Sequence, residues 1–187
     1  MTSDNIEEIK ADITVEDAGR IVEIYNYYVK NSVATFDTEE WSTEKMMNKI
    51  VEISSEFPYF VIRTDENDAD SNTEKNSVNN DGKKGKIAGY CYVHPWKEKD
   101  AYKATLESTI YISPEYTGKG IGKLLMNRLI ETCRKRDIKV LIACITEGNE
   151  GSFILHEHLG FEKVSHFKKV GIKFGKWLDV VDYELIL

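Results

Sequence analysis

Residues 116–123 of the chain read Tyr116-Thr117-Gly118-Lys119-Gly120-Ile121-Gly122-Lys123. This glycine run joins a strand-like segment that ends at Ser113 to an amphipathic, helix-like segment at 119–136. Three alternating glycines let the backbone turn tightly and present successive N–H groups at the start of a helix. Those N–H groups carry partial positive charge, so they favour a phosphate or pyrophosphate. The run therefore predicts a ligand with a phosphorylated part.

The spacing of the glycines excludes two common phosphate-binding loops. A Walker loop has four residues between its first glycine and its Gly-Lys pair, followed by Ser or Thr. Here three residues separate Gly118 from Gly122, and Leu124 follows Lys123. A dinucleotide-binding fingerprint reads G-x-G-x-x-G at the first strand of a βαβ unit, whereas this run reads G-x-G-x-G and lies deep in the chain. A glycine-rich connection without a ligand is the alternative.

Length and charge favour an ordinary single-domain protein. The chain has 187 residues, of which 41% are hydrophobic and 30% charged, so we expect one domain over residues 1–187. The net charge of −7 argues against sequence-independent binding of nucleic acid, which needs a basic surface. No apolar run is long enough to span a membrane, and the first residues are polar. We therefore expect a cytoplasmic protein without nucleic-acid or membrane partners.

The cysteines are Cys91, Cys133 and Cys144, and each lies in an apolar segment. An odd number of cysteines in such surroundings predicts buried free thiols in a reducing compartment. A catalytic thiol is the less frequent alternative. None of the three has the spacing of a zinc site, so no metal is expected.

The hydrophobic pattern predicts an α/β fold. Strand-like and amphipathic, helix-like segments follow one another in the order β, α, α, β, β, β, α, β, α, β, β. Such an order favours a sheet with helices on both faces. We expect strands at 6–13, 59–63, 86–94, 103–113, 140–145, 161–170 and 177–187, helices after Thr14 and at 42–55, 119–136 and 149–159, and a connection at 171–176.

Residues 65–85 contain almost no apolar side chains and read DENDADSNTEKNSVNNDGKKG. Such a segment cannot offset the entropy lost on ordering by burying apolar surface. We expect a mobile loop between two hairpin strands, more as a tolerated surface insertion than as a regulatory or partner-binding segment.

Beyond the glycine run, short stretches along the chain resemble one superfamily of enzymes. They are Ile24-Tyr25-Asn26, ATFDTE at 34–39, Ala88-Gly89-Tyr90, His94-Pro95-Trp96, LESTIYI at 106–112, Asn149 with LHEHLGF at 155–161, and GIKFGKWLDV at 171–180. Together they resemble the GCN5-related N-acetyltransferase superfamily, most closely the phosphinothricin and methionine sulfoximine N-acetyltransferases, over nearly the whole chain except residues 65–85. The resemblance implies a single-domain fold with a mixed, mostly antiparallel central sheet and helices on both faces. It also implies a homodimer.

The resemblance implies acetyl-CoA as the acetyl donor. The pyrophosphate would lie on the glycine run, the pantetheine arm would pair with the preceding strand, and Asn149 would contact the coenzyme from the last helix. Thr117 is irregular, because the superfamily usually has Gln or Arg there. The expected cofactor-binding residues are Ile110, Tyr111, Ile112, Thr117, Gly118, Lys119, Gly120, Ile121, Gly122, Lys123 and Asn149.

Glu107 is the proton acceptor that the resemblance implies. It is an acid within an otherwise apolar strand, which is costly unless it has a role. Strand alternation places it on one face with Thr105, Thr109 and Tyr111, provided that no bulge intervenes. A glutamate has an unperturbed pKa of about 4.3, and partial burial would raise it toward that of a better base. A surface glutamate on a half-exposed strand is the alternative.

His156 stands where many members of the superfamily have a tyrosine that protonates the coenzyme thiolate. An imidazolium can also donate a proton, and its unperturbed pKa of about 6.5 suits neutral operation. A histidine that packs or caps within the helix is an equally open interpretation. Tyr111 is the alternative acid, and His158 is expected on another, exposed face.

The acceptor side is less specific. Phe36 and Tyr90 are expected to line an acceptor pocket, and Lys173 is expected to meet an acceptor carboxylate, although each residue type is also common in ordinary packing. Ile172 occupies a position where the phosphinothricin enzymes tend to have tyrosine, which affects the identity of the acceptor.

The function that these features favour is N-acetylation of a small amino-acid-like amine, of the phosphinothricin or methionine sulfoximine type. Transfer would be direct, within a ternary complex. One alternative is a catalytically weak module that binds or senses acetyl-CoA. Another is an N-acetyltransferase that acts on a protein or peptide amine.

Overall fold

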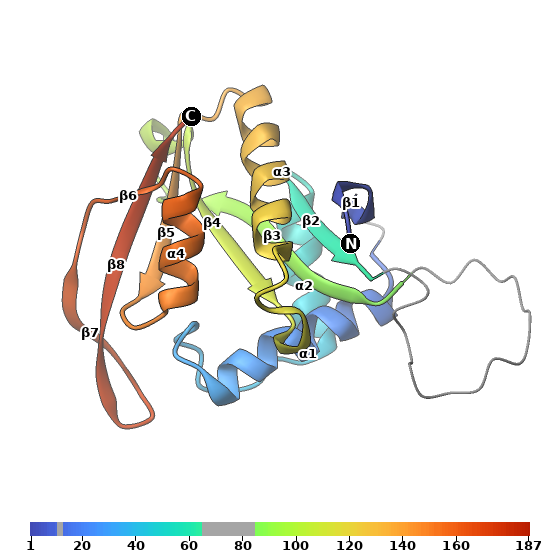
Figure 1. The fold of residues 1–187 in the computed structure, drawn as a ribbon, viewed down its shortest axis with the longest axis horizontal. Coiled ribbons are helices and arrows are strands. Elements are labelled where there is room, and N and C mark those ends of the chain that lie inside the picture. The colour runs from blue at the N-terminus through green and yellow to red at the C-terminus, as the bar shows by residue number, and fades with distance from the viewer. Residues whose placement is uncertain (11–12, 65–84) are drawn as a thin grey trace, which may run out of the picture.

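The computed structural model describes residues 1–10, 13–64 and 85–187. The loop expected at 65–85 therefore lies, except for Gly85, outside the described residues. Figure 1 shows the fold. Its helices are α1 (Val15–Asn31), α2 (Thr43–Ser54), α3 (Ile121–Lys135) and α4 (Glu150–His158), with 3-10 turns at Ser3–Asn5, Asp100–Tyr102 and Pro114–Tyr116. Its strands are β1 (Ile6–Glu8), β2 (Tyr59–Arg63), β3 (Ile87–Pro95), β4 (Thr105–Ile112), β5 (Val140–Thr146), β6 (Glu162–Lys163), β7 (Phe167–Lys173) and β8 (Lys176–Ile186).

One mixed sheet organises the molecule. The strand order is β1-β2-β3-β4-β5-β8-β6, and β7 pairs with β8. Within the described strands, only β4 and β5 run parallel; the other paired strands are antiparallel. The predicted mixed, mostly antiparallel sheet is therefore confirmed.

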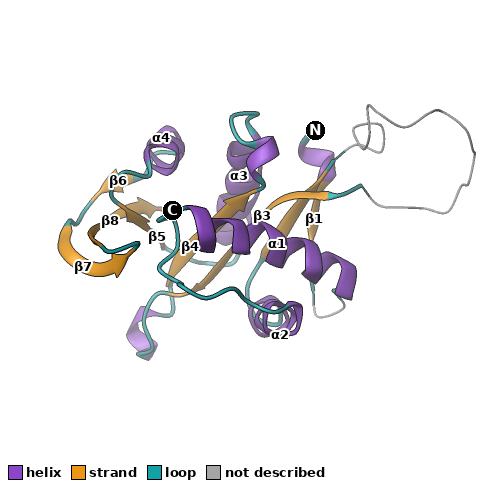
Figure 2. Cartoon of the chain, turned by 90° about the horizontal axis from the view of Figure 1, so that it is seen from below, coloured by secondary structure: helices purple, strands orange, loops and turns teal. Residues whose placement is uncertain are grey.

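Helices cover both faces of the sheet, as predicted (Figure 2). The face under α3 and α4 packs Phe60 and Ile62 of β2 against helix residues such as Leu125. The opposite face, under α1 and α2, packs Tyr59 and Val61 of the same strand. Successive side chains of a strand point to opposite faces, so the continuous apolar run of β2 supplies both cores.

Three helices begin with a polar side chain that accepts a backbone N–H. Thr14 Oγ1 accepts from Asp17 N at 3.1 Å, and Ser42 Oγ accepts from Lys45 N at 3.1 Å. Asn149 Oδ1 accepts from Ser152 N at 3.4 Å. Helix α3 differs because its N-cap is Gly120, at φ +78°, without a side-chain cap. The glycine run thus starts the one described α-helix that has no side-chain cap at its N-terminus.

The structure corrects the predicted ends of the sheet. The strand expected at 6–13 ends at Glu8. The strand expected at 161–170 is divided into β6 and β7, because Val164 N and Ser165 N turn to bond Asp182 O at 2.9 and 3.4 Å. The connection expected at 171–176 is mostly strand, and its turn needs only Phe174 and Gly175, both in left-handed conformations.

The thiol prediction is wrong at one of its three positions. Cys91 and Cys133 are buried, but Cys144 is exposed, although it lies in the apolar strand β5. The cause is the separation of β4 from β5 described below, which leaves Cys144 facing a cavity. Among the described helices, none is long and apolar enough to cross a lipid bilayer.

Candidate active site

Strands β4 and β5 part in the middle of the sheet. Their register pairs Thr105 with Val140, Leu106 with Leu141 and Glu107 with Ile142, and then stops, although both strands continue. Figure 1 shows the two arrows running apart beyond this point. A cavity of about 300 Å³ opens in the gap. Its walls include Glu107, Thr109, Cys144, Thr146 and His156.

A second cavity, of about 510 Å³, runs along α3 and α4 and meets the first. The two share Ala34, Ile110, Tyr111, Asn149 and Ser152 in their walls. Of the expected cofactor-binding residues, all except Lys119 line this groove. Lys119 instead holds its ammonium 4.9 Å from the centroid of the Tyr116 ring. The groove also contains residues that are not among those expected to bind the cofactor: Tyr28, Gly151, Ser152, Ile154, Leu155 and His158.

The start of α3 suits an anion. Gly118 and Gly120 have φ of +73° and +78°, and no atom lies within 4 Å of a Cβ added at either. Left-handed backbone of this kind favours glycine. The first turn of α3 has no side-chain cap and no acidic residue. Its N–H groups and partial positive charge are therefore suited to a pyrophosphate.

Glu107 faces His94 across the β3–β4 ladder, with 3.9 Å between Glu107 Oε1 and His94 Nε2. The β3–β4 register has no shift from Gly89 to Pro95, so Glu107 shares its face with Thr109 and Tyr111. Burial raises the pKa of the Glu107 carboxyl; the nearby His94 opposes that shift, and the Asp182 carboxylate adds to it. The carboxylate is therefore more basic than one in water.

His156 is 2% exposed and lines the first cavity. Its Nδ1 lies 2.8 Å from Ser152 O and donates to that carbonyl. Nε2 is buried and has no hydrogen-bond partner among the described residues. Burial lowers the pKa of the imidazole, while the Ser152 bond opposes that shift. The resting ring is thus neutral at pH 7, with a lone pair at Nε2.

Tyr111 lies in both cavities, and its hydroxyl donates to Ala34 O at 3.4 Å. Burial raises its pKa well above the usual value for a phenol, with the neighbouring Tyr25 adding to the shift. Cys144 also faces the cavity. Partial desolvation of its thiol, together with the nearby carboxylates of Glu107 and Asp182, raises its pKa to about 12. Both groups stay protonated near neutral pH.

The three expected acceptor residues separate in the structure. Phe36 lines the first cavity. Tyr90 is buried away from it, stacked with Tyr59 and Tyr92. Lys173 is 3% exposed, and its ammonium binds backbone carbonyls rather than facing the cavity. The structure therefore brings Phe36, but not Tyr90 or Lys173, to the cavity wall.

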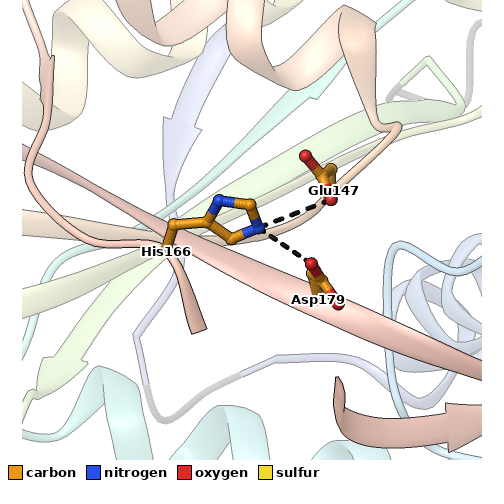
Figure 3. A group of neighbouring side chains, drawn as sticks. All are labelled: Glu147, His166 and Asp179. Atoms are coloured by element: carbon orange, nitrogen blue, oxygen red, sulfur yellow. Dashed lines mark hydrogen bonds and ion pairs between the residues drawn. The ribbon is translucent and has the colours of Figure 1, made fainter. Parts of the chain in front are cut away.

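Figure 3 shows a cluster of three neighbouring side chains, Glu147, His166 and Asp179. His166 Nε2 lies 2.9 Å from Asp179 Oδ2 and 3.5 Å from Glu147 Oε2. A hydrogen bond from Lys169 N, followed by the one from His166, lowers the pKa of Asp179. Among the described residues, this is the only set of three His, Cys, Asp or Glu side chains whose ligand atoms lie within 4.8 Å of one another. These contacts tie His166 to Asp179 of β8 and to Glu147, the residue that follows β5.

Some of the site residues missed by the sequence analysis carry a signal in the sequence. Ser152 and His156 are four residues apart, a spacing that places two side chains on one helix face. Ile154 carries no such signal, because its exposed fraction of 54% is seen only in the structure. The position of His94 opposite Glu107 depends on the register between β3 and β4, which the residues alone do not specify.

Comparisons with known proteins agree with this geometry. A model of the acetyltransferase (GNAT) family matches residues 21–161. The chain is 32% identical to a phosphinothricin N-acetyltransferase of Streptomyces coelicolor over 90% of each chain. It is 30% identical to an L-methionine sulfoximine/L-methionine sulfone acetyltransferase of Salmonella typhimurium, over 91% of this chain and 90% of that protein.

Solved structures show the same similarity. A phosphinothricin acetyltransferase from Sinorhizobium meliloti, in complex with AcCoA, has a TM-score of 0.81 and 32% identity, covering 98% of this chain and 89% of that one. A ribosomal-protein-alanine N-acetyltransferase from Brucella melitensis has a TM-score of 0.82 and 29% identity, covering 97% and 99%. The parted strands, the uncapped glycine turn and these matches lead to one conclusion: the chain belongs to the acetyltransferase (GNAT) family.

Proposed function

We propose that this enzyme transfers the acetyl group of acetyl-CoA to the amino group of a small amino-acid-like acceptor, of the phosphinothricin or methionine sulfoximine type. The observation that carries the proposal is the joining of two cavities at Ile110 and Tyr111, one along the glycine turn and one containing Glu107 and His156. The names of the similar enzymes support this acceptor class. Adjoining sites suit direct transfer within a ternary complex.

The glycine turn supports the binding of the donor. Acetyl-CoA supplies a thioester carbonyl and a thiolate leaving group. The uncapped N–H groups of α3 would hold its pyrophosphate, with Lys123 in the first turn. The edge of β4 beyond Glu107 has lost its pairing with β5, so its backbone groups would pair with the pantetheine arm and polarise the carbonyl.

Glu107 is the proposed base. An acceptor ammonium must lose a proton before its nitrogen attacks, after which a C–N bond forms and the C–S bond breaks. The raised pKa of Glu107 makes its carboxylate a better proton acceptor than a glutamate in water. The step needs the ionised form, so the rate should rise with pH through that pKa.

His156 is the proposed acid for the departing sulfur. Its resting ring is neutral, so Nε2 would first take the second proton, which the acceptor nitrogen releases as the C–N bond forms; its unpartnered lone pair is suited to that. The lowered pKa then makes that proton easy to donate to the thiolate. Tyr111 is the weaker candidate, because burial raises its pKa.

The test must distinguish this function from two alternatives. One structural neighbour is named for acetylation of a protein alanine, which favours a peptide amine as the second candidate acceptor. A module that only binds acetyl-CoA is the third. The test measures thiol release from acetyl-CoA with L-methionine sulfone, L-methionine sulfoximine, phosphinothricin and short peptides. We expect turnover with the free amino acids. Turnover with peptides alone, or none despite binding of acetyl-CoA, would overturn the proposal.

We also propose that the enzyme works as a homodimer in the cytoplasm. Large apolar side chains gather exposed on the β7–β8 hairpin, which supports a contact between copies: Phe167, Val170, Ile172, Phe174 and Trp177. The three cysteines are free thiols, which suits a reducing compartment. Sedimentation equilibrium should give the mass of a dimer, and a monomer at micromolar concentration would contradict it.

A further inference from the structure

A short loop after α1, residues 32–36, contributes Ala34, Thr35 and Phe36 to the wall of the cavity that contains Glu107. Four consecutive carbonyls of this loop each accept a hydrogen bond from a side chain on a distant strand. Lys173 of β7 donates to Ser32 O and Thr35 O, both at 2.8 Å. Thr146 of β5 donates to Val33 O at 2.7 Å, and Tyr111 of β4 donates to Ala34 O at 3.4 Å. The wall is therefore fixed by the sheet rather than by its own secondary structure.

Lys173 is the charged member of this set. Its ammonium is buried and uses its third N–H on Tyr28 O, at 3.3 Å, in the last turn of α1. A buried ammonium is costly unless its donors are satisfied, and carbonyls at a helix C-terminus are favourable partners for a cation. Each of its three donors is thus occupied by backbone. The exposed Lys176, which pairs with Lys173 in the hairpin, has no such role.

The same strand supports the side chain of Phe36. A Cβ added at Gly171 would lie 2.1 Å from Phe36 Cε2 and 2.6 Å from Phe36 Cδ2, so the ring rests directly on the backbone of β7. The φ of Gly171 is not in the left-handed region. Its lack of a side chain therefore serves the close approach of the ring and not a turn.

We propose that Lys173 and Gly171 are positioning residues that set the acceptor wall: Lys173 fixes the carbonyls of Ser32 and Thr35, and Gly171 provides the surface on which the Phe36 ring rests. Lys173 does not bind the acceptor carboxylate. This inference rests on the proposed acetylation of amino-acid-like amines, because it assigns their binding wall. It predicts that β7 controls acceptor affinity and the size of acceptor side chain admitted, while acetyl-CoA binding is independent of it.

The first test compares Lys173→Met with the matched control Lys176→Met, using L-methionine sulfone as acceptor. For Lys173→Met we expect the acceptor KM to rise about tenfold or more, with kcat within about threefold and acetyl-CoA affinity within about twofold of wild type. Lys176→Met should match wild type in all three. Equal rises in both variants, or an unchanged acceptor KM, would overturn the proposal.

Amide hydrogen exchange gives a readout that does not need turnover. In Lys173→Met, residues 32–36 should exchange faster while β2 and β3 keep their protection. If wild type shows no turnover, the proposed function fails, and this exchange measurement still judges the inference. Unchanged exchange at residues 32–36 would refute the positioning role even if the enzyme is active.

The second test uses Gly171→Ala, which removes no buried charge. The added methyl must displace the Phe36 ring, so the ranking of acceptors by side-chain size should change. In a Phe36→Ala background, the same Gly171→Ala change should have almost no effect, because the clashing ring is gone. Gly19→Ala, where the new Cβ has 4.0 Å of clearance, is the control. A Gly171→Ala effect that persists without the ring would contradict the assignment.

Discussion

At the scale of the residue, two groups in one cavity have pKa values shifted in opposite directions. Burial raises the pKa of Glu107 and lowers that of His156, because it disfavours the charged form of each. The carboxylate becomes a better base and the imidazolium a better acid. In the proposed mechanism, one desolvated site thereby prepares both proton transfers of acetyl transfer.

Replacing Glu107 with Gln should lower kcat by about 100-fold at pH 7, the lower end of what a general base contributes. Coenzyme affinity should stay near that of wild type. Because burial disfavours the ionised form of Glu107, it opposes folding as pH rises through the raised pKa, so the Gln variant should be at least as stable at pH 7. The measurement is a pH–rate profile with thermal melts. Glu98→Gln, at an exposed position, is the control; an unchanged profile in Glu107→Gln would remove the residue from the base role.

Replacing His156 with Phe should separate activity from stability. Nε2 is a buried acceptor without a partner, and such a group costs about 1–3 kcal/mol. The variant should therefore keep its melting temperature while losing most of its turnover. Steady-state kinetics and calorimetry on the same sample test this. If the variant instead has a lowered melting temperature and normal turnover below that temperature, the His156 ring serves packing alone.

At the scale of the element, the turn before α3 can be tested through its backbone. Gly120→Ala places a Cβ in left-handed backbone, at a cost of about 1–2 kcal/mol, and in the space where a pyrophosphate would bind. Gly175→Ala has a similar φ, +72°, and equally open space, but it lies in the β7–β8 turn. Urea unfolding should show a similar decrease in the free energy of unfolding for the two variants. Calorimetry should show weaker acetyl-CoA binding only for Gly120→Ala. Equal acetyl-CoA affinities of the two variants would argue against a pyrophosphate-binding site at the turn before α3.

Local signals explain which elements could be predicted. Polar residues before α1, α2 and α4 are N-caps within the sequence itself, and the glycine run marks the start of α3. The strand at 161–170 was mispredicted because its break depends on Asp182, in a strand formed later in the chain. The role of Lys173 was missed for the same reason, since its partner Thr35 lies 138 residues away. Cys144 has an apolar local sequence and is exposed only because β4 and β5 part.

At the scale of the whole molecule, a partly buried ionic cluster ties the first segments of the chain together. Arg63 of β2 forms two hydrogen bonds with the Asp17 carboxylate of α1, at 2.9 and 2.8 Å, and one with Glu7 of β1 at 2.8 Å. Its side chain is 11% exposed. The cluster joins β1 and β2 to the first turn of α1, and residues 32–36 follow the other end of that helix.

Breaking this cluster should destabilise the entire fold. Asp17→Asn leaves the Arg63 charge with a weaker partner, and for this partly buried pair we expect a loss of about 1–3 kcal/mol in the free energy of unfolding, between the values for surface and buried pairs. Glu52→Gln, which breaks the exposed pair with Lys49, should cost less than about 1 kcal/mol. Urea unfolding at pH 7 measures both. Similar decreases in the free energy of unfolding of the two variants would show that the Arg63 cluster contributes no more to stability than a surface ion pair.

Direct acetyl transfer between the two joined cavities can be tested by the initial-rate pattern. Acetyl-CoA and L-methionine sulfone are varied together. Transfer within a ternary complex predicts double-reciprocal lines that intersect. The thiol in the cavity, Cys144, has a pKa of about 12 and is protonated at neutral pH, so it is not expected to carry the acetyl group. Parallel lines, or no turnover at any concentration, would contradict the account.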